Sequence, residues 1–148
     1  MRRTGEIEVI ARAVCARGGR LLLCRTKGAR HTYLPGGHVE FGEPAAAALE
    51  RELREELGVA ARATRFLGVV EHKFVQKGTL HHELNFVFEA RMPSLDPRRN
   101  PVSQENYIEF EWIELAGLAG SDLEPAPLRR LVPAWMKGRS VRRWAGTF

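Results

Sequence analysis

The chain has little of what marks secreted, disulfide-bonded or membrane proteins. It has two cysteines among 148 residues, Cys15 and Cys24, and their spacing matches no zinc motif. No apolar run approaches the roughly 20 residues of a membrane-spanning helix. The basic start, MRRTGEIEVIARAV, lacks the long apolar segment and cleavage site of a signal peptide. We therefore expect a cytoplasmic protein whose thiols are buried and free.

Length and charge limit the number of domains and the kind of partner. With 44% hydrophobic and 28% charged residues, the chain suits a single globular domain over 1–148, with a core of about 6–137 and a basic C-terminal tail over 138–148. The net charge of +5 suits polyanionic ligands, from nucleotides to nucleic acid. Six Lys or Arg residues and no acid lie in the last twenty positions. A solvated helix face with a loose tail explains that excess better than a nucleic-acid-binding patch, although both interpretations stay open.

The pattern of apolar residues predicts alternating strands and helices. Gly18-Gly19 is typical of a hairpin between two strands, and Pro44 and Gly58 are typical of a helix start and a helix end. The stretch 26–32, the glycine loop that follows it, the proline-containing stretch 92–105 and the tail from Gly138 are predicted to be irregular. The predicted strands are 6–17, 20–25, 62–75, 80–91 and 107–115, and the predicted helical segments are 44–57, 115–120 and 128–136, with Pro133 kinking or shortening the last one. This order predicts an α+β fold, a mixed sheet with helices packed on it.

The helix over 44–57 carries three carboxylates on one face. Glu52, Glu55 and Glu56 are spaced i, i+3 and i+4, so they project from the same patch. Like charges at such spacings destabilise an isolated helix by a few tenths of a kcal/mol per pair. A hard divalent cation with oxygen ligands is the natural compensation. A neighbouring apolar stripe is expected to pack on the sheet and hold these acids outward: Ala46, Leu49, Leu53 and Leu57.

The glycine loop and this helix together resemble a known family. Gly37, five residues, Glu43, seven residues and then RELREELGV over 51–59 match the Nudix box, G-x(5)-E-x(7)-R-E-U-x-E-E-x-G-U, at every defined position. The flanking strand order is similar to the Nudix fold over about residues 6–137. The resemblance implies an α/β/α sandwich that hydrolyses a nucleoside diphosphate linked to another moiety.

The resemblance also implies roles for the box residues. Phosphoanhydride cleavage needs charge neutralised on phosphate oxygens and a water activated near phosphorus, and Mg²⁺ held by carboxylates supplies both. We expect Mg²⁺, with Mn²⁺ as the alternative. The expected metal ligands are Glu52, Glu55, Glu56 and the backbone carbonyl of Gly36. Arg51 is expected to orient a box glutamate, Glu43 to anchor the loop to the helix start, and Gly58 to have a structural role.

Residues outside the metal set are less well determined by sequence. Glu52 is the favoured general base or metal ligand, and Glu105 is the candidate base from outside the box, with a plain surface acid as an equally good interpretation. Arg25, Gly37 and His38 are the candidate substrate contacts. For His38 a polar loop role is the simpler alternative. A homodimer stays open as an alternative to a monomer, because the apolar strand segment Leu84–Phe88 suits a dimer contact and the core equally well.

The substrate depends on residues beyond the box. Val75 occupies the position where many ADP-ribose pyrophosphatases have a proline. The short length and the loop LPGGHVEFGE are more similar to small nucleoside-triphosphate pyrophosphatases. We therefore expect hydrolysis of a (deoxy)nucleoside triphosphate to the monophosphate and pyrophosphate. ADP-ribose or a nucleotide sugar is the alternative substrate, and a non-catalytic nucleotide- or RNA-binding module is the alternative class.

Overall fold

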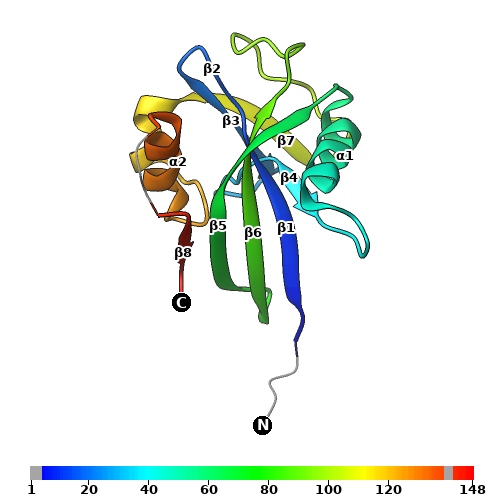
Figure 1. The fold of residues 1–148 in the computed structure, drawn as a ribbon, viewed down its shortest axis with the longest axis vertical. Helices are drawn as coiled ribbons and strands as arrows, with labels where there is room; N and C mark the ends of the chain where they lie inside the picture. The colour runs from blue at the N-terminus through cyan, green and yellow to red at the C-terminus, as the bar shows by residue number, and fades with distance from the viewer. Residues whose placement is uncertain (1–4, 139–141) are drawn as a thin grey trace.

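The computed structural model describes residues 5–138 and 142–148, which form two β-sheets between two α-helices (Figure 1). This is the predicted mixed sheet with helices packed on both sides. The helical segments are α1 (Ala45–Leu57), the 3₁₀-helix η1 (Leu115–Gly120) and α2 (Leu128–Met136). The strands are β1 (Ile7–Val14), β2 (Ala16–Arg17), β3 (Arg20–Thr26), β4 (Gly36–His38), β5 (Arg62–Gln76), β6 (Thr79–Arg91), β7 (Ile108–Glu114) and β8 (Trp144–Gly146).

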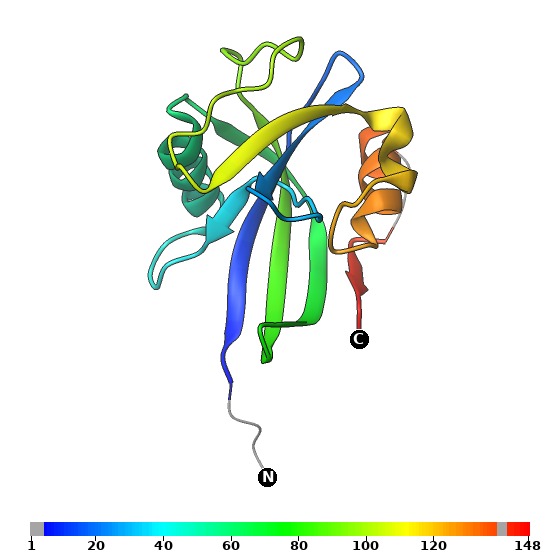
Figure 2. The ribbon, with the colours of Figure 1, turned by 180° about the vertical axis from the view of Figure 1, so that it is seen from behind.

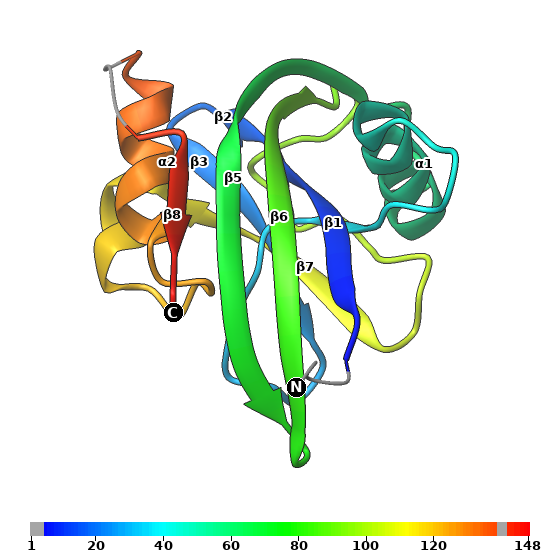
Figure 3. The ribbon, with the colours of Figure 1, turned by 60° about the horizontal axis from the view of Figure 1, so that its bottom comes forward.

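The larger sheet has the strand order β4-β1-β6-β5-β8, and Figure 3 shows β8, β5, β6 and β1 side by side. β6 pairs in parallel with β1 and antiparallel with β5. Because successive side chains point to opposite faces of a strand, Glu83 and Asn85 of β6 lie on the same face as their β5 partners His72 and Val70.

The smaller sheet has the order β2-β3-β7 and explains why the predicted first strand is in fact two. The chain leaves the larger sheet after Val14 and joins the smaller one at Ala16, with Cys15 between them. Cys15 still accepts a backbone hydrogen bond from Leu22, at 3.0 Å. Both cysteines are buried and free, as predicted, and burial raises the pKa of each thiol to about 11.

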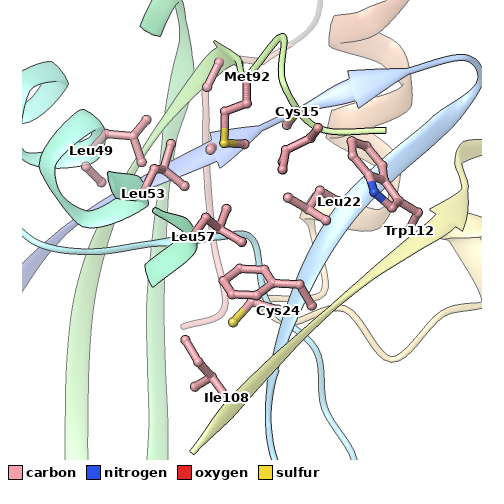
Figure 4. Packing of buried hydrophobic residues seen from close by; sticks show 14 residues of the cluster. Cys15, Leu22, Cys24, Leu49, Leu53, Leu57, Met92, Ile108 and Trp112 are labelled. Carbon is pink, nitrogen blue, oxygen red and sulfur yellow. The ribbon is translucent and has the colours of Figure 1, made fainter. Parts of the chain in front are cut away.

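One core lies between α1 and the sheets. Leu49, Leu53 and Leu57 of α1 pack into a cluster with Cys24 and Trp112, among others (Figure 4). Burying each leucine contributes about 1.5–3 kcal/mol. The predicted stripe is wrong at one position: Ala48 is fully buried and Ala46 only half-buried. Gly58 ends the helix in the left-handed region with φ 67°, as its sequence position predicts.

A second core lies on the opposite side, under α2 (Figure 2). Leu128, Val132 and Trp135 of α2 pack with the apolar side chains of Leu23 and Val70. Pro133 lies inside the nine-residue helix and does not end it. Among the described residues, no helix is long and apolar enough to cross a membrane.

Two segments predicted to be irregular are strands. β4, in the glycine loop, pairs with β1, with Ile10 opposite His38. β8 corrects the prediction of a loose tail from Gly138, because Trp144 to Gly146 pair in parallel with β5. Gly68 permits this pairing, since a Cβ there would lie 2.5 Å from the carbonyl oxygen of Arg143. Residues 139–141 of the predicted tail lie outside the described residues.

Candidate active site

Arg51 is the centre of the box contacts. Its Nε and one terminal nitrogen donate to the two carboxylate oxygens of Glu43 at 2.7 and 3.0 Å, and the other terminal nitrogen donates to Glu52 at 2.9 Å. It also reaches Glu55, at 3.3 Å, and the carbonyl oxygen of His38, at 3.1 Å. One guanidinium thus joins the loop, the helix start and two of the three patch glutamates. The contacts needed for the predicted roles of Arg51 and Glu43 are present.

Glu43 closes the loop before the helix. Its second carboxylate oxygen accepts the backbone N–H of Glu40, at 3.1 Å. The hydrogen bond from Arg51, followed by that from the Glu40 backbone, lowers the pKa of Glu43. The carboxylate therefore stays charged and ties the loop to α1.

Glu56 is half-buried and differs from the other patch acids in the surroundings of one of its carboxylate oxygens. Its Oε2 is enclosed and accepts no hydrogen bond from the described residues. The pKa of Glu56 is raised to about 8, mainly by burial and next by the charge of Glu52; Arg12 lowers it, and Glu105 and Glu55 add smaller increases. An enclosed carboxylate oxygen without a donor, surrounded by other carboxylates, suits a bound cation.

The patch is not a preformed cage. In residues 5–138 and 142–148, no three His, Cys, Asp or Glu side chains converge closely enough to hold an ion as they stand. The physical reason is Arg51, which draws Glu52 and Glu55 toward its own guanidinium. Mg²⁺ suits this arrangement, because it keeps several waters and binds substrate phosphates, so it does not need a cage made by the protein alone.

The two predicted loop glycines are needed for close approach. A Cβ on Gly37 would lie 2.3 Å from Cδ of Glu52, and a Cβ on Gly36 would lie 1.9 Å from the carbonyl oxygen of Ala11. Gly36 also has φ +143°, which L side chains rarely adopt. Any side chain at these positions would push β4 away from β1 or from the Glu52 carboxylate.

Glu105 lies beside the patch although it is 49 positions from Glu56 in sequence. Its loop is fixed to the end of α1, because the backbone N–H of Gln104 donates to the carbonyl oxygen of Glu56 at 2.7 Å. The backbone N–H of Glu105 in turn donates to the hydroxyl of Ser103, at 3.0 Å. The charge of Glu105 contributes to the raised pKa of Glu56. The two carboxylates are therefore electrostatically close.

Two predicted substrate contacts are already engaged within the protein. Arg25 forms an ion pair with Glu111 across the smaller sheet. His38 is exposed, and its Nε2 lies 2.8 Å from Oε1 of Glu8, whose other oxygen lies 3.0 Å from Nδ1 of His81. Their predicted role in substrate binding is untested by these contacts.

Sequence reasoning missed a cavity of about 510 Å³, whose lining is separate from the acidic patch. Arg12 of β1 connects the cavity with the acidic patch. Its side chain lines the cavity, and its charge lowers the pKa of Glu56. Its terminal nitrogen donates to the carbonyl oxygen of Leu34, at 3.1 Å, and its guanidinium lies 5.2 Å from the ring centroid of Tyr33. An arginine inside the apolar run VIARAV was the only sequence signal. The lining comprises Arg12, Thr26, Ala29, His31, Thr32, Tyr33, His72, Phe74, Val75, Gln76, Glu83, Glu124 and Pro125.

Another, more open hollow of about 920 Å³ lies between α2 and β8. Arg130, Arg142 and Trp144 are among its lining residues, and no box residue is. It is therefore separate from the acidic patch.

Comparison with known proteins agrees with the box. The family model described as the NUDIX domain matches residues 7–135. The isopentenyl-diphosphate Delta-isomerase of Cereibacter sphaeroides (strain KD131 / KCTC 12085) is 34% identical over 118 residues, covering 74% of this chain and 66% of the relative. The 8-oxo-dGTP diphosphatase of Escherichia coli (strain K12) is 32% identical over 92 residues, covering 62% of this chain and 64% of that relative. The chain spans just under two thirds of the length of these relatives.

Solved structures show the same architecture. A MutT protein from Methanosarcina mazei Go1 aligns with a TM-score of 0.68 and 21% identity, covering 91% of this chain and 96% of that one. The likeness covers most of the chain and so extends well beyond the box. From the complete box, the matched residues 7–135 and this shared fold, we conclude that the chain belongs to the Nudix hydrolase family.

Proposed function

We propose that the chain is a Mg²⁺-dependent pyrophosphohydrolase that converts a (deoxy)nucleoside triphosphate to the monophosphate and pyrophosphate. The observation that carries this proposal is the enclosed carboxylate oxygen of Glu56, which has no donor in the described part of the chain and lies in a patch that Arg12 joins to a cavity of nucleoside size. A cation site next to such a cavity suits a ligand with phosphates at one end and a flat ring at the other.

The metal ligands would be Glu52, Glu55, Glu56 and the carbonyl oxygen of Gly36. The bound cation supplies neutralisation of phosphate charge and a lowered pKa of water. Arg51 holds Glu52 and Glu55 in place before binding, and Glu43 holds Arg51. Loss of such supporting contacts typically costs about 10–100-fold in metal affinity or activity.

Proton removal from the attacking water needs a carboxylate near the patch. Glu105 suits this role because its loop is fixed to the carbonyl of Glu56 and its charge is felt there. Glu52 is the alternative base within the box. Glu52 accepts a hydrogen bond from Arg51, whereas among the described residues Glu105 has no hydrogen bond from Arg51. The Glu105 carboxylate is therefore the better candidate to accept a proton.

The cavity would take the nucleoside. Phe74 and His72 stack on one wall, with ring centroids 4.7 Å apart, and Phe74 stacks again on His81 at 4.9 Å. Aromatic walls of this kind favour flat heteroaromatic rings. Arg12, between this wall and the acidic patch, is placed to contact the phosphates that join the two ends of the substrate.

Two alternative functions would use part of the same site. With ADP-ribose or a nucleotide sugar, the same acids cleave the same kind of bond and the leaving group is a sugar phosphate. As a non-catalytic nucleotide- or RNA-binding module, the chain would bind through its basic surface, including Arg130 and Arg142 of the larger hollow. The isomerase relatives make isopentenyl diphosphate a further compound to examine.

The deciding experiment is chromatographic analysis of all products, including pyrophosphate, nucleoside monophosphates, sugar phosphates and isomerised diphosphates, across a panel with Mg²⁺: the common (deoxy)nucleoside triphosphates, 8-oxo-dGTP, ADP-ribose, nucleotide sugars and isopentenyl diphosphate. Pyrophosphate release from a triphosphate supports the proposal. Monophosphates formed only from ADP-ribose or nucleotide sugars would replace it with the first alternative function. No turnover, together with RNA binding that weakens with salt, would replace it with the binding module.

A homodimer is also proposed, on the outer face of the larger sheet. Within the segment Leu84–Phe88, Asn85 and Val87 are fully buried, whereas Leu84, Phe86 and Phe88 are half-buried on the opposite face. Phe66, whose ring lies 5.5 Å from that of Phe88, is 39% exposed there. Light scattering would test this: a mass of one chain at all concentrations contradicts the dimer.

A further inference from the structure

A buried carboxylate on the cavity floor has no part in the scheme above. Glu83 of β6 is 9% exposed and lines the cavity, two positions before the fully buried Asn85. A chain of hydrogen bonds fixes it: Nε of Arg12 donates to Oδ1 of Asn85 at 3.1 Å, and Nδ2 of Asn85 donates to Oε2 of Glu83 at 3.2 Å. Asn85 also donates to the carbonyl oxygen of Val70, at 3.3 Å. The Glu83 carboxylate is therefore held in one orientation.

One oxygen of this carboxylate has no partner among the described residues. Among residues 5–138 and 142–148, no group donates a hydrogen bond to Oε1 of Glu83, and this atom is not among the enclosed ones. It is thus open to the cavity that Glu83 lines. The other cavity carboxylate, Glu124, is occupied by Arg129 at 2.8 Å. Among the described residues that line the cavity, Glu83 is thus the carboxylate that no arginine occupies, and it keeps lone pairs free for a ligand.

The Glu83 carboxylate lies in the same cavity as the stacked rings of His72 and Phe74. It would favour a bound base that carries N–H groups on the edge facing it. Guanine carries two adjacent donors there, N1–H and the 2-amino group, which match the two oxygens of a carboxylate. Adenine and cytosine each place a ring nitrogen acceptor next to their amino group, and uracil flanks its single N–H with two carbonyl oxygens. The ring nitrogen or carbonyl oxygen of these bases would be repelled by the carboxylate oxygens of Glu83.

We propose that Glu83 is a specificity-determining residue that reads the N1–H and 2-amino edge of a guanine-type base. The inference rests on the proposed function for the phosphate chemistry and adds the class of base. Each Glu83 oxygen has two lone pairs, so Oε2 accepts from Asn85 and from the base at once. Ring changes at C8 leave this edge intact, so the inference covers oxidised guanine as well.

The test on the unaltered protein compares GTP with ITP, which lacks only the 2-amino group, and with ATP. The kcat/KM for GTP is expected to exceed that for ITP by about tenfold or more, the size expected of one hydrogen bond to a charged acceptor. ATP is expected to fall below ITP, because its N1 is an acceptor. Equal kcat/KM values for GTP and ITP would overturn the inference.

The matched variant is Glu83→Gln, with Glu71→Gln on the opposite face of β5 as its control. Glu83→Gln is expected to bring the GTP-to-ITP ratio of kcat/KM close to one, and Glu71→Gln to leave this ratio as it is. A ratio unchanged in a folded Glu83→Gln protein would contradict the assignment. If Glu83→Gln does not fold, the GTP and ITP comparison on the unaltered chain decides alone.

Binding measurements separate this inference from the proposed function. If no triphosphate is turned over, the proposed function fails, but calorimetry with GMP and IMP still tests Glu83. Tighter binding of GMP than of IMP would support the inference, and equal binding would overturn it. Comparison of GTP with 8-oxo-dGTP then distinguishes an ordinary from an oxidised base.

Discussion

The acidic patch around Arg51 and the cavity behind Arg12 are assembled in different ways. The patch comes from one continuous stretch, Gly36 to Val59, in which Glu43, Glu52 and Glu55 share the guanidinium of Arg51. The cavity is built from β1, the segment 26–33, β5, β6 and the Glu124-Pro125 turn, which are far apart in sequence. A local motif can therefore define the chemistry, whereas recognition of the substrate depends on how distant strands pair.

This difference predicts different kinetic effects of mutation in the two regions. Changes in the patch should lower kcat, because they remove interactions with the reacting phosphate. Changes in the cavity should raise KM, because they remove contacts that are equal in the ground state and the transition state.

The largest effect is expected for Glu56→Gln. Losing a charged ligand should remove several kcal/mol of transition-state stabilisation, or about 10³-fold in kcat/KM. Pyrophosphate release with Mg²⁺ measures this effect. Glu50→Gln on the same helix is the control, because glutamine keeps the acceptor that Glu50 offers to the backbone N–H of Ala63. A fully active Glu56→Gln protein would show that the metal assignment is wrong.

Glu105→Gln should lower kcat by about 10²-fold with little change in KM, if Glu105 is the general base. Glu109→Gln, an exposed acid of β7, serves as the comparison and should stay near the unaltered rate. Unchanged turnover in Glu105→Gln would transfer the role of base to Glu52.

The raised pKa of Glu56 predicts how stability depends on pH without metal. Because the folded-state pKa of about 8 exceeds the ordinary value of 4.5, the folded state binds this proton more tightly. The resulting stability is fully present below about pH 4.5 and is lost as pH rises through about 8. The free energy of unfolding should fall by about 1–3 kcal/mol across that window.

Denaturant unfolding with a chelator, from pH 5 to 8, tests this linkage. His72 titrates in the same window with the opposite sign, because burial lowers its pKa. Subtracting the free energy of unfolding of Glu56→Gln from that of the unaltered protein at each pH cancels the contribution of His72, which is common to both. Excess Mg²⁺ should offset the loss, because the cation binds the deprotonated carboxylate. A difference that does not vary with pH would contradict the raised pKa.

The smallest effect is expected for Phe74→Leu in the cavity. Removing the aromatic face should raise KM by about tenfold, in line with roughly 1–3 kcal/mol per stacked base, and leave kcat nearly unchanged. Phe66→Leu, on the opposite face of β5, is the matched control. A lower kcat with unchanged KM would place Phe74 in the chemistry and remove the contrast between the two regions.

Sequence reasoning succeeded where a property depends on near neighbours along the chain. The 3.6-residue period placed Glu52, Glu55 and Glu56 on one face of α1, and Gly58 ended that helix as predicted. It failed where backbone pairing decides: β4 and β8 were predicted to be irregular, because glycines and basic residues carry no periodic apolar signal. The break of the first strand at Cys15 was also hidden, since both sheets accept the same apolar alternation.

By itself, the sequence determined the box, its acidic helix face and the family resemblance, because these depend on spacing within 23 residues. Tertiary structure alone decided that one carboxylate oxygen of Glu56 is enclosed without a donor among the described residues, and that the loop of Glu105 is fixed to the end of α1. It also decided that Arg12, Asn85 and Glu83 form one hydrogen-bonded chain. The reason is physical: the burial of a side chain, its pKa and the orientation of its hydrogen-bond acceptors depend on which distant residues pack around it and exclude water. Helical periodicity, in contrast, depends only on the local backbone.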